Sequence, residues 1–259
     1  MVERFFNGSS SVSSTTVAEH SQGGCCITSD PIMLLSGPPS SGKTSLLFQY
    51  ALNMAGHCQL PSQRYVVFIC NCRRFETKPP FLSQGIDASS DILQRILIKY
   101  IDDYDDEGIK KYFASFHLLP HFPCAVIIDD FGDFFHDSNC QQRYSNSRGR
   151  DLAMIRILAL CHSAITHANK TTTCQLLVSD THLGDSPRHL FIYKRWISSI
   201  FTIQGEGDGS GSFLLEHSVH VTERVTRKRR ARYSIALQYL ILEEIINDVS
   251  SLRLKHSDN

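Results

Sequence analysis

The 259-residue sequence has no excess of either charge, no long apolar run and no cysteine pair of the C-x-x-C type. Its 26 Lys and Arg balance 26 Asp and Glu, so binding to nucleic acid would have to come from local basic patches. Nine cysteines without such a pair are typical of reduced thiols in a cytosolic or nuclear setting, which favours buried thiols over zinc ligands at Cys70 and Cys72 and at Cys25 and Cys26. Because the sequence lacks a basic-then-apolar leader and a run of about twenty apolar residues, we expect a chain that is neither secreted nor membrane-spanning.

The most informative pattern that is present is G-x-x-x-x-G-K-T at residues 37–44, directly after the apolar run 32–35. Its two glycines let the backbone wrap closely around a polyphosphate, so that successive N–H groups and the start of the next helix face the anion. Lys43 would then reach the β- and γ-phosphates, and Thr44 would place its hydroxyl on Mg²⁺. The predicted phosphate-binding loop, called the P-loop below, consists of Gly37, Pro38, Pro39, Ser40, Ser41, Gly42, Lys43, Thr44 and Ser45.

Strand-like apolar runs alternate with helix-like patterns after residue 28. The strand-like runs are 32–35, 65–70, 124–128 and 175–178, and the helix-like segments are 45–55, 91–100 and 151–168. This alternation predicts an α/β fold with a mainly parallel central sheet that is covered on both faces.

The C-terminal third has a different pattern. Runs 199–203 and 213–217 flank a glycine-rich turn and predict a C-terminal β-hairpin, while 232–242 fits either a strand or a helix. We therefore divide the chain into a disordered Ser/Thr-rich tail (1–28), one domain (29–247) and a C-terminal tail (248–259).

A second chemical feature is the apolar run 124–128, which ends in Asp129 and Asp130. In a protein with a P-loop, such a strand is the Walker B strand. Asp129 would then help to hold the Mg²⁺ beside Thr44.

The whole arrangement resembles the RecA-like recombinase core, over about residues 31–245. It looks closest to the recombinase-paralogue ATPases that associate with a SWIM-type zinc-finger protein, because the pair Arg73-Arg74 follows a short second strand. The resemblance implies a RecA-like P-loop NTPase that binds ATP, Mg²⁺ and single-stranded DNA. It implies an accessory role in homologous recombination DNA repair in the nucleus, with a SWIM zinc-finger protein, the recombinase and its paralogues as partners.

The catalytic base is where the sequence departs from the recombinases. Cys72 stands nearest to the place of their catalytic glutamate, and a thiol replaces a carboxylate as general base only with a strongly lowered pKa. Asp130 and Glu76 are the carboxylates that remain, and we predict slow, DNA-stimulated hydrolysis with Lys43 and Asp130 as catalytic residues. A helix or turn cap is the alternative role for Asp130. Asp180 and Thr181 fall near the position of the recombinase γ-phosphate sensor.

Two segments correspond to the DNA-binding loops of recombinases, 136–150 after the Walker B strand and 185–196 after the strand-like run 175–178. Cations with interleaved aromatics suit single-stranded DNA, because the cations meet phosphates and the rings stack on bases. The alternative is a pair of solvated loops whose aromatics cover the sheet. The predicted DNA-binding residues are Arg143, Arg148, Arg188, Lys194 and Arg195.

Two charged runs and two other functions complete the predictions. The basic run 224–232 fits a nuclear-localisation signal, a phosphate-contacting ridge or a solvated loop, and the acidic run 102–107 is interpreted as a solvated linker. A hydrolysis-deficient interaction scaffold and a P-loop kinase for a small molecule are the alternative functions. The sequence has no Arg-rich lid segment of the kind that such a kinase would use.

Overall fold

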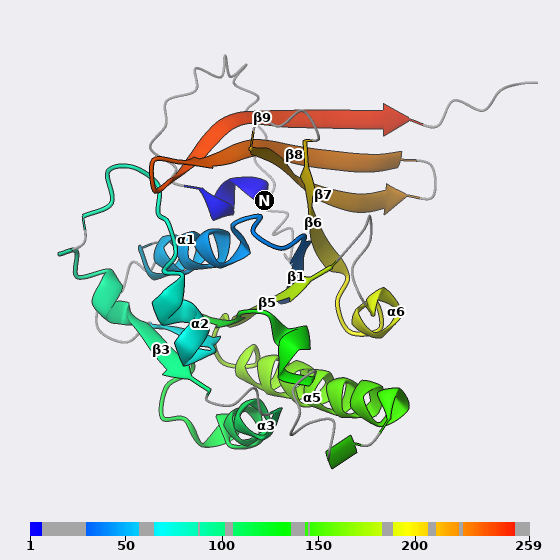
Figure 1. The fold of residues 1–259 in the computed structure, drawn as a ribbon. Helices are drawn as coiled ribbons and strands as arrows, with labels where there is room; N and C mark the ends of the chain where they lie inside the picture. Colours follow the sequence, from blue (N-terminus) through cyan, green and yellow to red (C-terminus); the bar gives the residue numbers. More distant parts are fainter. Residues whose placement is uncertain are drawn as a thin grey trace, which may run out of the picture.

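The computed structural model describes residues 1–6, 30–56, 65–87, 89–101, 106–135, 143–144, 146–182, 189–206, 211–222 and 225–251. Within them, nine strands form one sheet in the order β3-β2-β4-β5-β1-β6-β7-β8-β9 (Figure 1). The first six strands in this order are parallel and the remaining ones are antiparallel. The fold is therefore α/β with a mostly parallel central sheet and antiparallel C-terminal strands, as predicted.

Five parallel strands coincide with predicted apolar runs, because a strand that is covered on both faces needs an almost continuous apolar sequence. They are β1 (Ile32–Gly37), β2 (Val66–Cys70), β4 (Ala125–Ile128), β5 (Gln175–Thr181) and β6 (Ser199–Gly205). Leu34 on β1 pairs with Val178 on one side and Ile200 on the other. The P-loop therefore leaves the sheet from its middle.

The helix predicted over 91–100 is wrong. This segment is a short 3-10 helix, Leu93–Arg95, followed by the edge strand β3 (Ile96–Tyr100), which pairs in parallel with β2. The β-branched Ile96 and Ile98 and the aromatic Tyr100 favour an extended strand, and β2 offers the hydrogen bonds for it. Only Ile96 of this strand is buried.

The predicted C-terminal hairpin is confirmed, and it is part of a larger antiparallel ribbon. β6 pairs with β7 (Ser212–Thr222), which pairs with β8 (Val225–Ala236), which pairs with β9 (Tyr239–Ser251). The open choice for 232–242 resolves as two strands joined at Leu237 and Gln238, whose φ angles of 51° and 64° suit a two-residue hairpin turn. β9 also continues past residue 247, where we placed the end of the domain.

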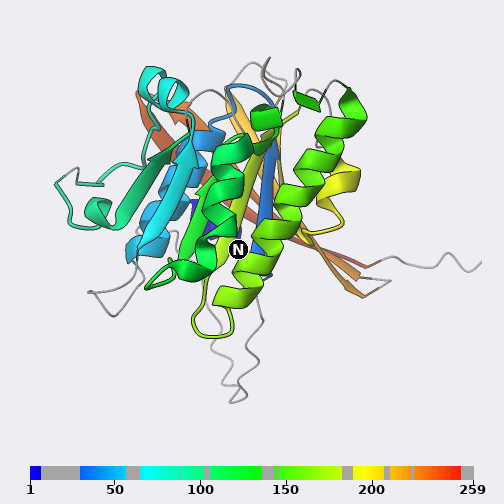
Figure 2. The same cartoon turned by 90° about the horizontal axis from the view of Figure 1, so that it is seen from below.

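Helices cover both faces of the sheet (Figure 2). One face packs against α1 (Lys43–Gly56), which follows the P-loop, and the other against α3 (Asp106–Ala114) and α5 (Ser147–Ala168). The shorter elements are α2 (Cys72–Thr77), α6 (Leu190–Tyr193) and the 3-10 helices Phe116–Leu118 and Phe131–Phe135. The helices predicted over 45–55 and 151–168 thus correspond to α1 and α5.

Residues 1–6, which the sequence assigns to a disordered tail, instead pack into the core on the α1 side. Val2–Phe5 form a 3-10 helix, and Val2, Phe5 and Phe6 are at most 2% exposed. The Phe5 ring lies 5.3 Å from that of Tyr50 and 5.0 Å from that of Phe201. Three large apolar side chains in six residues suffice to order this segment, so the prediction of a tail is corrected there. Residues 7–28 lie outside the described residues.

Candidate nucleotide-binding site

The predicted P-loop and Walker B residues meet at the carboxyl edge of the parallel strands. The P-loop follows β1, Asp129 follows β4, and Thr181 ends β5. Asn71, which caps α2, follows β2 at the same edge. Ligands of open α/β sheets bind in this position, because the helices that follow the strands begin there.

The P-loop closes on itself through its own side chains. Gly42 has a φ of +77°, a left-handed conformation that favours glycine, and Ser41 Oγ donates to the Pro38 carbonyl at 2.8 Å. Lys43 Nζ donates to the carbonyls of Gly37 at 3.2 Å and Pro38 at 2.9 Å. The Lys43 side chain is 6% exposed, and burial lowers its pKa, whereas Asp130 and Asp129 act in the opposite direction. A buried ammonium beside loop carbonyls is positioned for phosphate oxygens that enter the loop.

Thr44 and Asp129 are in direct contact. Thr44 Oγ1 donates to Asp129 Oδ2 at 2.8 Å, and Ser179 Oγ on β5 donates to Asp129 Oδ1 at 2.9 Å. Burial, with a smaller contribution from Asp130, raises the pKa of Asp129 to about 6. Both carboxylate oxygens are thus oriented by hydroxyl donors, and Ser179 is a site residue that the sequence analysis did not single out. The signal that could have identified Ser179 was its position as a polar residue near the end of the apolar strand β5, which pairs with the Walker B strand β4.

Asp130 is held by side chains from two other elements. Thr181 Oγ1 donates to its Oδ1 at 2.5 Å, and Arg74 Nη2 of α2 forms an ion pair with its Oδ2. Its backbone has a φ of 51°, and its N–H donates to Ser179 Oγ at 2.8 Å. Its carboxylate therefore contacts two other residues of the candidate site, Arg74 and Thr181, while its backbone carbonyl accepts a hydrogen bond from the Asp133 N–H of the 3-10 helix that follows.

The other two candidates near β2 lie elsewhere. Cys72 is the first residue of α2, and its thiol contacts Glu76 Oε1 at 3.3 Å, one helical turn later. The residues of this segment that line the space in front of Asp129 are Asn71 and Arg74. Arg74 also forms an ion pair with Asp133, between Nη1 and Oδ2 at 2.6 Å. In the sequence, Arg74 served only to indicate the resemblance to the SWIM-associated ATPases. Its place just after a parallel strand was a signal that it is a site residue.

Asp180, at the predicted sensor position, is buried at 2% exposure against the start of the segment after Walker B. A Cβ on Gly132 would lie 2.4 Å from Asp180 Oδ1, so a side chain at position 132 would displace this carboxylate. Burial raises the pKa of Asp180 to about 7, and the hydrogen bond from the Thr181 backbone N–H opposes this shift. Asp180 thus stands as a buried carboxyl group beside Asp130 and Asp133, while Thr181 contacts Asp130 directly.

The C-terminal ribbon supports the P-loop from behind, which no sequence pattern indicated. Tyr233 on β8 is fully buried, and its hydroxyl donates to the Ser41 carbonyl at 2.7 Å. A Cβ on Gly42 would lie 2.3 Å from Ile235 Cδ1, so the loop and β8 are in close contact. The antiparallel ribbon is therefore part of the candidate site, because β8 contacts the P-loop directly.

The predicted DNA-binding cations have different environments. Arg143 donates to the buried Asp106 carboxylate at 2.9 Å, and Tyr144 donates to its other oxygen at 2.6 Å. Asp106 begins α3 and is 1% exposed, so the acidic run is not a solvated linker at this residue, because α3 packs there against the chain before α5. These contacts give Arg143 a structural role.

The remaining described candidates lie near the start of α5 and directly after α6. Arg148, Lys194 and Arg195 are exposed, and Arg188 lies outside the described residues. Both views place α6 beside the first turns of α5, and His189 Nδ1 lies 3.7 Å from Asp151 Oδ1 (Figures 1 and 2). Of the aromatics in this segment, Phe191 is 69% exposed, but Tyr193 is fully buried and Trp196 packs against the core. For Tyr193 and Trp196 the alternative role in covering the sheet is correct.

The basic run lies on a strand and pairs with carboxylates. Within its described side chains, Lys228 and Arg230 approach Glu216 at 3.0 and 3.7 Å, and Arg232 approaches Glu206 at 3.0 Å. Ala231 and Tyr233 alternate with them and are buried. The interpretation as a loop is therefore wrong, because the described part of the run is strand β8, in which Ala231 and Tyr233 face the core.

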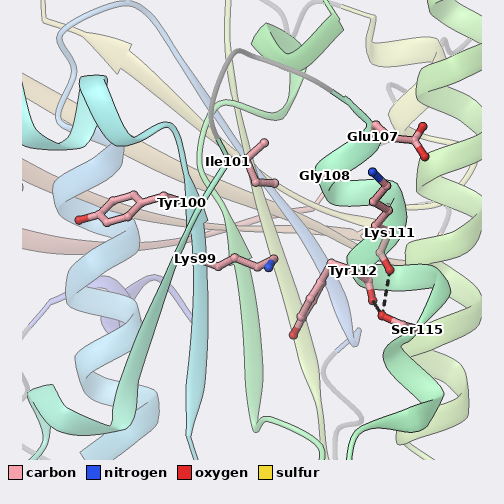
Figure 3. Close-up of a pocket in the computed structure, with 8 residues that line it drawn as sticks. All are labelled: Lys99, Tyr100, Ile101, Glu107, Gly108, Lys111, Tyr112 and Ser115. Carbon is pink, nitrogen blue, oxygen red and sulfur yellow. Dashed lines mark hydrogen bonds between the residues drawn. The ribbon is translucent and has the colours of Figure 1, made fainter.

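A hollow of about 410 Å³ lies away from the P-loop, between β3 and α3 (Figure 3). Lys99 Nζ there lies 5.8 Å from the centroid of the Tyr112 ring. None of the predicted site residues lines this hollow. Its lining residues are Lys99, Tyr100, Ile101, Glu107, Gly108, Lys111, Tyr112 and Ser115.

Comparison with known proteins gave no matching family model and no matching curated sequence. Among the described residues, no helix has the length and apolar character that a membrane crossing requires. In the same part of the chain, no three His, Cys, Asp or Glu side chains gather as a metal cluster. A Mg²⁺ ion held mainly by substrate phosphates needs only one or two protein carboxylates, so Thr44 and Asp129 fit that kind of site.

Proposed function

We propose that the chain is an ATPase of the RecA-like P-loop class that binds ATP·Mg²⁺ through Lys43, Thr44 and Asp129. The hydrogen bond of 2.8 Å between Thr44 and Asp129 carries the proposal, because it joins the end of the P-loop to the end of the Walker B strand β4, which is separated from β1 by β5. These two residues would hold Mg²⁺, which when bound neutralises charge on the β- and γ-phosphates. Lys43 would exchange the carbonyls of Gly37 and Pro38 for phosphate oxygens.

Asp130 is the proposed general base. It accepts a proton from the attacking water as the water oxygen bonds to the γ-phosphorus. The bond between the γ-phosphorus and the bridging oxygen breaks, and its electron pair leaves with ADP. Because Asp130 is paired with Arg74 and Thr181, the base is restrained and we expect slow hydrolysis. A positioned general base contributes roughly 10²–10⁴-fold to a rate.

Single-stranded DNA is the second proposed ligand, with a role in homologous recombination in the nucleus beside a SWIM zinc-finger protein, the recombinase and its paralogues. The P-loop, Asp129 and the pair Arg73-Arg74 support this part of the proposal through the family resemblance. The exposed Arg148, Lys194 and Arg195, on neighbouring segments, support the DNA contact.

The test measures ATP affinity and turnover with and without single-stranded DNA for the wild type, Lys43→Ala and Asp130→Asn. We expect Lys43→Ala to lose affinity or turnover while remaining folded, and Asp130→Asn to lose turnover while retaining ATP. Unchanged affinity and turnover in a folded Lys43→Ala protein would exclude the P-loop assignment. Binding without turnover under any condition would favour the scaffold, and turnover that depends on a small-molecule acceptor would favour the kinase.

A further inference from the structure

Arg74 closes the space into which a γ-phosphate would have to enter. The cavity lined by Asn71, Arg74, Asp129, Asp130, Asp133 and Phe134 measures only about 10 Å³. That volume holds at most about one water molecule. The Asp130 carboxylate therefore has almost no open space beside it. The group that occupies this space is the Arg74 guanidinium, which forms an ion pair with the carboxylate.

The position of Arg74 is set by the fold. Asn71 caps α2 and accepts a hydrogen bond from the Arg74 N–H at 3.0 Å, which anchors the start of this short helix at the end of β2. From there the guanidinium forms ion pairs with Asp130 through Nη2 and with Asp133 through Nη1. A guanidinium carries five N–H donors, so these two contacts leave donors for a further anion.

Arg74 lies close enough to Lys43 for the two positive charges to interact. The positive charge of Arg74 contributes to the lowered pKa of Lys43, and Asp130 and Asp129 act on both cations. The Walker B carboxylates and Arg74 thus line one small volume, and the Thr44 hydroxyl donates to one of these carboxylates, Asp129. A triphosphate whose β-phosphate lies in the P-loop would bring its γ-phosphate toward this volume.

We propose that Arg74 reads the γ-phosphate from within the same chain, an inference that rests on the proposed ATP binding. Arg74 pairs with Asp130 and Asp133 in the structure, and these contacts leave little space beside the Asp130 carboxylate. When ATP binds, the guanidinium exchanges Asp130 for γ-phosphate oxygens and remains held by Asp133.

The experiment compares the affinities of the full chain for ADP and for a non-hydrolysable β,γ-imido analogue of ATP, both with Mg²⁺, by competition against a fluorescent nucleotide. The variants are Arg74→Gln and Arg74→Lys, and the matched control is Arg73→Gln, which removes the same charge from the exposed neighbouring residue. We expect Arg74→Gln to lower affinity for the ATP analogue at least about tenfold, or about 1.4 kcal/mol, and to change that for ADP less than about twofold. Arg73→Gln should change neither.

Equal losses for the two nucleotides would overturn the proposal, as would an unchanged or raised affinity for the ATP analogue in Arg74→Gln. If Arg74→Gln does not fold, Arg74→Lys decides, because it keeps the charge but loses the forked geometry. It should then show a smaller loss confined to the ATP analogue, and a loss shared with ADP would contradict the proposal. If the wild type binds neither nucleotide, the proposed function itself fails, and this is seen before any variant is measured.

Discussion

Tyr233 donates its hydroxyl to the Ser41 carbonyl of the P-loop at 2.7 Å, across a sequence separation of 192 residues. Tyr233→Phe removes this donor and leaves a buried carbonyl without it. Such a loss costs about 1–3 kcal/mol. We expect a lower free energy of unfolding in chemical denaturation and weaker nucleotide binding, since the loop loses its support. Tyr239→Phe, at an exposed position of β9, is the control, and equal behaviour of the two variants would remove the support role.

A second prediction concerns the contact between Gly42 and Ile235. Gly42→Ala should destabilise the protein through its φ of +77° and through the close approach of the new Cβ to Ile235 Cδ1 at 2.3 Å. In a double-mutant cycle with Ile235→Ala, the steric part should disappear and the conformational part should remain. The measured unfolding free energies should therefore be non-additive by about 0.5–3 kcal/mol. Additive effects would show that β8 does not press on the loop.

The third prediction is the pH dependence that Asp180 causes. Its pKa is about 7 in the folded protein, against about 3.9 in an unfolded chain. Between these values the folded state binds more protons, so the free energy of unfolding contributed by Asp180 falls as pH rises from about 4 to about 7. Asp180→Asn should remove this decline and be the more stable protein at pH 8. Because Asp129 titrates in the same range, the quantity to compare is the difference between variant and wild type. A constant difference across this range would contradict the prediction.

The fourth prediction concerns single-stranded DNA. Replacing Arg148, Lys194 and Arg195 together by Ala should weaken binding and flatten its salt dependence. The slope of log affinity against log salt should change by about 0.7 for each phosphate contact that is lost. A control with the same change in net charge replaces the exposed Lys110, Lys111 and Lys170. Equal affinities and slopes for the two triple variants would remove the first set from the DNA site.

The central sheet could be predicted from the sequence, because a parallel strand that is covered on both faces needs an almost continuous apolar run. The apolar runs that form β1, β2, β4 and β5 could be recognised in the sequence. Because the carboxyl ends of parallel strands share one edge of the sheet, the proximity of Asp129 to Thr44 could be predicted as well. The edge strand β3 was missed, because its five residues fit a helix as well as a strand until β2 offers hydrogen bonds. Only Ile96 of the five is buried, so burial gave little help.

What the sequence could not provide were contacts between distant elements. Arg74 sits on a helix of six residues, and its role depends on where Asp130 and Asp133 end up beside it. Tyr233 looks like any buried strand residue until β8 is seen against the P-loop. Residues 1–6 were assigned by the polar composition of the segment after them, although their own apolar side chains decide their packing.

The central position of β1 has a consequence for how the chain folds. β1 lies between β5 and β6, so Met33 can pair only after Leu177 and Ser199 have been synthesised. Ser41 can accept its hydrogen bond only after Tyr233, which is still later in the chain. Such non-local pairing slows folding, because loop closure costs entropy before the contacts form. During synthesis from the N-terminus, the apolar β1 emerges first and remains unpaired until most of the chain has followed. The phosphate-binding loop is thus encoded early but becomes organised last, and the nascent chain is most prone to aggregation in that interval.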